Sequence, residues 1–145
     1  MVQVSRSVLL NYTVDEMFSI VNDIESYPQF VPNCIHGEVH EDLGHEMLAT
    51  ISFKALGLKQ ALTTRNRIVL GESISMSLVE GPFSKLEGSW EFIALSEAAS
   101  KVICTLSFKP KSRYARFAAK PALNKAANSA LDGFNKRVVE VYGKR

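Results

Sequence analysis

Residues 121–142 read PALNKAANSALDGFNKRVVEVY, and this stretch decides the fold. At helical spacing its apolar side chains fall in one stripe, and the charged side chains lie off it. The stripe comprises Leu123, Ala127, Ala130, Leu131, Phe134, Val138, Val141 and Tyr142, and the charged residues off it include Lys125, Asp132, Lys136 and Glu140. Burying its larger side chains contributes at most about 7–15 kcal/mol, less than the cost of ordering about twenty residues. The sequence therefore predicts an amphipathic helix over residues 121–142 whose apolar face needs a large partner.

The segment from residue 34 to residue 108 supplies that partner, because its apolar residues recur with the strand period of two. Gly44, Gly57, Gly71, Gly81-Pro82 and the stretch 96–100 divide it into six runs, most with one apolar and one polar face, which predicts an antiparallel meander covered on one side. In residues 58–70, however, Gln60, Thr64 and Asn66 share the apolar face. Each would cost about 1–3 kcal/mol if buried alone, so we expect these groups to be paired, solvated or lining a hollow.

The opposite face of residues 58–70 is basic, with Lys59, Arg65 and Arg67. Two interpretations remain open for these side chains. They pair across strands with Glu87 and Glu91, or they bind an anionic partner.

The N-terminal residues complete the predicted fold. Residues 2–10 alternate as a strand whose apolar face is interrupted by Arg6, and Thr13 with Glu16 forms a capping box for a helix over residues 14–22. Two prolines, Pro28 and Pro32, limit the next segment to a short helix or turn. The expected fold class is α+β, a helix grip in which a seven-stranded curved antiparallel sheet wraps around the C-terminal helix, with residues 1–145 as one domain.

Composition is ordinary for a globular protein, with 46% hydrophobic and 22% charged residues. No run approaches the roughly 18 apolar residues that span a bilayer, and residues 1–10 lack the apolar core of a signal peptide, so we expect a cytoplasmic location. Cys34 and Cys104 lie far apart without a CxxC pattern, which indicates reduced, buried thiols.

Charge is distributed unevenly along the chain. Residues 109–145 hold ten basic and two acidic residues, a balance of +8, whereas residues 1–108 hold seven basic and thirteen acidic, a balance of −6. Such asymmetry is typical of a surface for nucleic acid or anionic membrane, although a solvated helix face is the simpler alternative. The candidate phosphate contacts are Arg113, Arg116, Lys120, Lys125, Lys136 and Arg137.

Catalytic and metal-binding patterns are weak. The sequence has His36, His40 and His45 among acidic residues. Side chains in a turn region are not held so that they point at one metal ion, so we expect no metal site. The glycine-containing motifs of phosphate-binding loops and of serine nucleophiles do not occur in the sequence, and no catalytic constellation is visible. Trp90 fits a core position or a ligand platform. We therefore predict a protein that is not an enzyme.

Several segments carry a family resemblance. They are VSRS (4–7), VNDIESYPQFVP (21–32), TTRN (63–66), GPF (81–83), LEGSW (86–90), GFNKR (133–137) and VY (141–142). Together they resemble the START-like, Bet v 1-like helix-grip family of coenzyme-Q-binding proteins and polyketide cyclases, and more narrowly its bacterial ribosome-association toxin branch. The chain departs from the family pattern at Asn33, where Trp is frequent, and at Gly133, where Ala is frequent.

The resemblance implies three functions. The first is binding to the large ribosomal subunit so that the small subunit cannot join, with no DNA partner. The second is a carrier for ubiquinone or another isoprenoid lipid, with peripheral membrane contact and a cavity walled by Leu62, Ile68, Trp90, Phe92, Phe108, Leu131 and Phe134. The third, an aromatase or cyclase, is disfavoured because no acid–base constellation is visible.

Overall fold

The structure is a computed structural model that describes residues 2–55, 58–110 and 115–145, without the side chains of residues 55, 58, 115–120, 122 and 123. Its elements follow the predicted order. They are β1 (Val2–Leu10), α1 (Val14–Asn22), the 3₁₀ helix η1 (Ile24–Gln29), β2 (Cys34–Asp42), β3 (Glu46–Ala55), β4 (Leu58–Val69), β5 (Ser73–Glu80), β6 (Lys85–Ala94), β7 (Ser100–Lys109) and α2 (Ala115–Tyr142).

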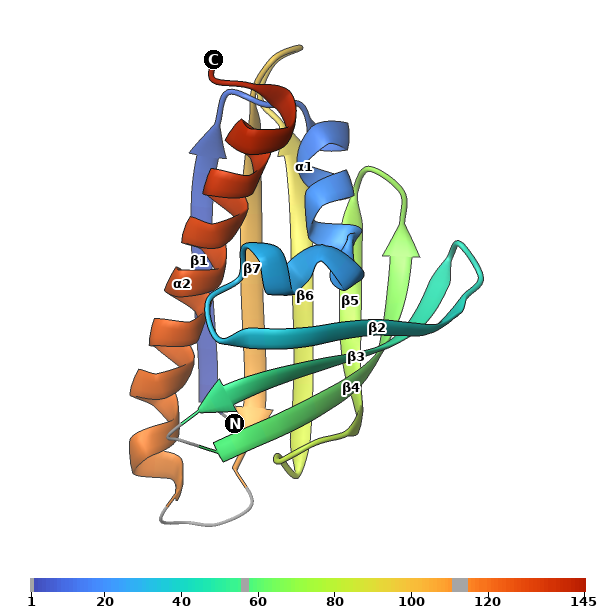
Figure 1. Ribbon diagram of the computed structural model, residues 1–145. Helices are drawn as coiled ribbons and strands as arrows, with labels where there is room; N and C mark the ends of the chain where they lie inside the picture. The colour runs from blue at the N-terminus through green and yellow to red at the C-terminus, as the bar shows by residue number, and fades with distance from the viewer. Residues whose placement is uncertain (1, 56–57, 111–114) are drawn as a thin grey trace.

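The seven strands form one antiparallel sheet in the order β1-β7-β6-β5-β4-β3-β2. Strands β2 to β7 each lie beside the next strand along the chain. Strand β1 pairs with β7 and forms the edge of the sheet beside α2. Figure 1 shows β2, β3 and β4 running across the other strands, so the sheet curls around the side on which the helices lie. The predicted helix-grip architecture is confirmed.

The first helix begins at the predicted capping box. The backbone N–H of Glu16 donates to Thr13 Oγ1 at 3.1 Å, and the N–H of Thr13 donates to Glu16 Oε1 at 2.9 Å. These two bonds satisfy donors that the first turn of a helix leaves free. Pro28 then lies inside η1, which confirms the short second helix.

Helix α2 differs from the prediction at both ends. It begins at Ala115 instead of residue 121, so Pro121 lies inside the helix, where it removes the backbone donor of one intrahelical hydrogen bond. Near the other end, Val141 is 49% exposed although the pattern placed it in the apolar stripe. Val141 lies about 60° around the helix from the fully buried Val138, and Tyr142 takes the half-buried place in this turn.

Two apolar clusters hold the sheet and helices together. The main core contains Met17, Phe18 and Val21 of α1, Trp90 and Phe92 of β6, and Leu131, Phe134 and Val138 of α2. A smaller cluster at the other end of the sheet contains Val2, Leu86 and Phe108, with Leu62, Leu78 and Phe83 packed against it.

The polar residues of β4 resolve the alternatives left by the sequence. Thr64 and Asn66 are buried, and Thr64 Oγ1 donates to Asn66 Oδ1 at 2.7 Å, so these groups are paired. On the basic face, Arg65 lies 3.5 Å from Glu46, and the predicted pairing with Glu87 or Glu91 is wrong. The reason is strand order, because β4 neighbours β3 and β5, while both glutamates belong to β6.

Candidate functional site

The space between the sheet and α2 holds the residues predicted to wall a cavity, but in separate groups. Ile68, Trp90, Phe92, Leu131 and Phe134 belong to the main core, whereas Phe108 and Leu62 belong to the smaller cluster. The rings of Trp90 and Phe134 meet edge to face with centroids 5.2 Å apart. Direct contact therefore joins the sheet to the helix at this point.

Between the two clusters the inner face of the sheet is less well covered. Met76, Leu78 and Leu106 are apolar and point inward, yet each is only half-buried. A Cβ atom at Gly88 would lie 2.5 Å from Met76 Cε and 2.9 Å from Leu106 Cδ2, so both side chains lie against bare backbone of β6. Met76 and Leu106 therefore cover Gly88, while part of each side chain stays accessible.

Arg6 links the edge strand to the helix across the inner face. Its Nε donates to Asn128 Oδ1 at 2.9 Å, and one of its terminal nitrogens donates to Asn124 Oδ1 at 2.8 Å. Asn124 and Asn128 are one helical turn apart, so the guanidinium joins β1 to one face of α2. The interruption that Arg6 makes in the apolar pattern of β1 is therefore a helix-docking contact.

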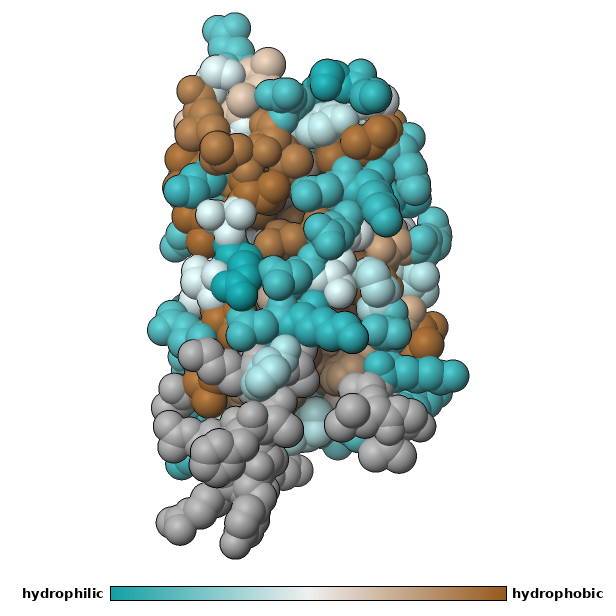
Figure 2. All heavy atoms as spheres, turned by 90° about the vertical axis from the view of Figure 1, so that its left-hand side faces the viewer, coloured by the Kyte–Doolittle hydropathy of each residue, from teal (hydrophilic) through white to brown (hydrophobic). Residues whose placement is uncertain are grey.

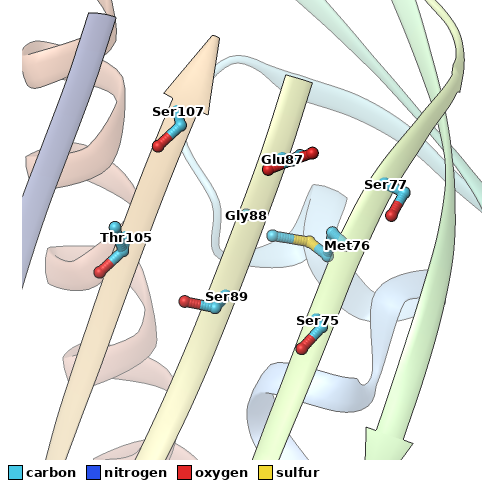
Figure 3. Close-up of a pocket in the computed structure, with 8 residues that line it drawn as sticks. All are labelled: Ser75, Met76, Ser77, Glu87, Gly88, Ser89, Thr105 and Ser107. Carbon is cyan, nitrogen blue, oxygen red and sulfur yellow. The ribbon is translucent and has the colours of Figure 1, made fainter. Parts of the chain in front are cut away.

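The outer face of the sheet carries a hollow of about 350 Å³ lined mainly by hydroxyl groups. Figure 3 shows it from the outside, with side chains from β5, β6 and β7 and with the helices behind the sheet. The lining residues are Ser75, Met76, Ser77, Glu87, Gly88, Ser89, Thr105 and Ser107. A second hollow, of about 620 Å³, is lined by Thr50, Gln60, Ala61, Thr63, Glu80, Gly81 and Pro82. None of the seven predicted cavity residues borders either hollow.

Of the six predicted phosphate contacts, three have side chains in the described part of the structure, and all three lie on α2. Arg113 and the side chains of Arg116 and Lys120 lie outside the described parts, whereas Lys125 and Lys136 are exposed on α2. Arg137 is different, because its guanidinium carbon lies 5.3 Å from the centre of the Phe30 ring and a terminal nitrogen lies 3.4 Å from Glu140. Its side chain is only 22% exposed, so Arg137 contributes to packing on this side of α2.

The interior thiols and phenol have high pKa values. Burial raises the pKa of Cys104 to about 12, and burial also raises the pKa of Cys34 and of Tyr27. Both thiols are free and stay protonated near neutral pH. Within the described residues, no cluster of three or more His, Cys, Asp or Glu side chains has a geometry that could hold a metal ion.

In the parts of the chain that the structure describes, no helix is both long and apolar enough to cross a bilayer.

Residues 10–135 match the family described as polyketide cyclase / dehydrase and lipid transport, and the chain belongs to this family. Solved structures share the fold of this chain. One is the Zhui aromatase/cyclase of a Streptomyces species, which is 14% identical, superposes with a TM-score of 0.88 and is matched over 94% of this chain and 93% of its own. At that identity the likeness concerns the fold alone.

Closer relatives are found among bacterial toxins. The chain is 38% identical to the ribosome association toxin RatA of Vibrio cholerae, over 99% of each chain. It is 35% identical to the ribosome association toxin RatA of Escherichia coli K12, over 100% of this chain and 92% of that protein. The resemblance read from the sequence is therefore confirmed at the level of the family.

Proposed function

We propose that this protein binds the large ribosomal subunit and inhibits translation by preventing the small subunit from joining. The observation that carries the proposal is the similarity, along almost the whole chain, to proteins named ribosome association toxins. The charge balance of +8 over residues 109–145 supports a partner rich in phosphate. In this proposal Lys125 and Lys136 of α2, together with Arg113, Arg116 and Lys120, are candidate contacts.

Sedimentation tests the proposal. Purified protein is added to separated large and small ribosomal subunits at low magnesium, and each mixture is run through a sucrose gradient. We expect the protein to migrate with the large subunit and not with the small one, and we expect it to lower the yield of joined ribosomes when magnesium is raised. Equal migration with both subunits, or with neither, would contradict the proposal.

A second candidate function is the carriage of an apolar ligand such as a quinone or another isoprenoid lipid. The half-buried Met76, Leu78 and Leu106 on the inner face favour it, because a ligand placed there would complete their burial. Organic extraction of the purified protein followed by mass spectrometry should then find one such lipid in a fixed ratio to protein. Leu106→Gln should remove the lipid, whereas Leu95→Gln, at a 52% exposed site in the β6–β7 turn, should not.

A further inference from the structure

Two pairs of lysines stand directly opposite each other on neighbouring strands. Lys54 of β3 lies opposite Lys59 of β4, and Lys85 of β6 lies opposite Lys109 of β7. All four side chains are exposed. We call these four residues the basal lysines. Like charges directly opposite each other on a sheet are destabilising, so each pair lowers the stability of the free protein.

The basal lysines lie on one face of the sheet. One row of paired residues marks the outer face from β4 to β7. Along this row Arg65 pairs with Ser77, Ser77 with Glu87, and Glu87 with Ser107. Lys59, Lys85 and Lys109 are an even number of residues from these markers on their own strands, so their side chains point to the same side. Lys54 shares that side because it lies opposite Lys59.

The basal lysines also lie at one end of the molecule. Figure 1 shows the ends of β3 and β7 and the beginnings of β4 and β6 at the lower end, where α2 begins. Leu62, Phe83, Leu86 and Phe108 pack in one cluster there, which holds β4 close to β6 and β7. The backbone N–H of Ser84 donates to the carbonyl of Lys109 at 3.0 Å, and this bond fixes the Lys85–Lys109 pair.

Neighbouring carboxylates offset only part of the charge at this end, where Glu87 and Glu80, which is opposite Thr63, are both exposed. Lys85 Nζ lies 3.4 Å from Glu87, but both side chains are more than half exposed. An ion pair with that exposure is weak, and its lysine stays available to another anion. The hydroxyl-lined hollow lies alongside, because Glu87 and Ser107 form the next row of the sheet after Lys85 and Lys109. Its serines offer short donors that allow a phosphate to approach the sheet closely.

An anionic membrane is the other polyanion to consider, but the two most exposed large apolar side chains among the described residues lie at the other end of the molecule. Leu9 and Leu70 are 67% and 78% exposed there, whereas Val79, 53% exposed near the end of β5, is the exposed aliphatic residue near the basal lysines. Figure 2 shows that apolar side chains on the face formed by β1 and α2 also gather in the upper half. The charge at the lower end therefore fits a polar polyanion better than a lipid surface.

We propose that the outer face of the sheet at the basal lysines contacts RNA phosphates, so that the ribosome is bound through this end of the sheet and not through the exposed side of α2 alone. This inference rests on the proposed ribosome association. Two observations carry it: the like-charged pairs, and the position of both pairs on one face and at one end of the sheet.

The test compares three double variants. Lys54→Gln with Lys59→Gln, and Lys85→Gln with Lys109→Gln, each remove one basal pair. The control, Lys101→Gln with Lys144→Gln, removes the same charge at the other end, where Lys101 lies on β7 about 26 Å from Lys109. Binding of each protein to purified large subunits is measured over a series of potassium chloride concentrations. Thermal melting is used to confirm that each variant is folded.

Each basal variant should bind at least about tenfold more weakly near 0.1 M salt, with a salt slope smaller by about 1.5, whereas the control should stay within about twofold of the wild type. If the wild type binds and the basal variants bind equally well, the inference is wrong while the ribosome proposal stands. If the wild type does not bind, the ribosome proposal itself fails. Vesicles of anionic phospholipid form a parallel arm, and a loss of binding confined to vesicles would overturn RNA as the partner.

Discussion

At the scale of single residues, the two departures from the family pattern lie at one joint. Asn33 has a φ of 65°, a left-handed conformation that Asn tolerates better than most residues, and its carbonyl accepts a hydrogen bond from the N–H of Lys54 at 2.9 Å. Gly133 lies where α2 passes the same connection between η1 and β2, and a Cβ atom there would be 2.4 Å from the carbonyl oxygen of Phe30. Gly133 therefore permits the close approach of α2 to this connection, and Asn33 permits the left-handed turn that leads from the connection into β2.

Gly133→Ala tests that close approach. On helix propensity alone the substitution should stabilise the protein by about 1 kcal/mol. The clash is with backbone, which cannot move aside as a side-chain tip does, so we expect net destabilisation of about 1–3 kcal/mol. Urea unfolding measures the change. Asp132→Ala, next to it on the exposed side of α2, is the control and should change stability by less than about 1 kcal/mol. A Gly133→Ala protein more stable than the wild type would contradict the packing described.

At the scale of elements, the beginning of α1 is tied to the residues that follow α2. Arg145 places its two terminal nitrogens 2.5 and 2.6 Å from the carboxylate of Glu16, and its guanidinium carbon lies 5.0 Å from the centre of the Tyr12 ring. The hydroxyl of Tyr12 donates to the carbonyl of Gly143 at 2.7 Å. Glu16 therefore serves both its own capping box and this second contact, which joins two helices distant in sequence.

The pKa of Glu16 should make this contact visible in acid. Hydrogen bonds from Arg145 and from the backbone of Thr13 lower the pKa of Glu16 from 4.5 to about 2. A carboxyl group with a lowered folded-state pKa stabilises the fold above its unfolded pKa, and that contribution is lost as pH falls from about 4.5 towards 2. The stability difference between the wild type and Glu16→Gln should therefore be largest above pH 5 and shrink towards pH 2, as followed by urea unfolding at each pH. A difference that stays constant with pH would show that the charge of Glu16 does not stabilise the fold.

At the scale of the whole molecule, sequence periodicity predicted the fold because burial on one face fixes both the strand period and the helical stripe. The capping box was predicted to the residue, since it depends only on neighbours in sequence. Contacts between segments distant in the sequence were not predicted: the partner of Arg65 is Glu46, and Arg137 packs on Phe30. The basal lysines were missed for the same reason. Lys54 and Lys59 are only five residues apart in the sequence, so a hairpin register could have revealed that pair, but Lys85 and Lys109 meet only through the register of β6 and β7.

The basal lysines also predict how stability responds to salt. Lys54→Glu with Lys109→Glu places a carboxylate opposite Lys59 and opposite Lys85, so each repulsive pair becomes attractive. At about 10 mM salt we expect this variant to be more stable than the wild type by about 0.2–1 kcal/mol per pair, and the gain should vanish near 1 M salt, where charges are screened within about 3 Å. Chemical denaturation by urea at both salt concentrations measures this, because urea adds no ions. Lys101→Glu with Lys144→Glu changes the net charge equally, from +2 to −2, without facing another lysine in the described register. An equal gain in stability in that control would show that net charge causes the effect. A gain confined to the basal variant, together with its loss of ribosome binding, would show that the basal lysines destabilise the free protein at the surface where RNA is proposed to bind.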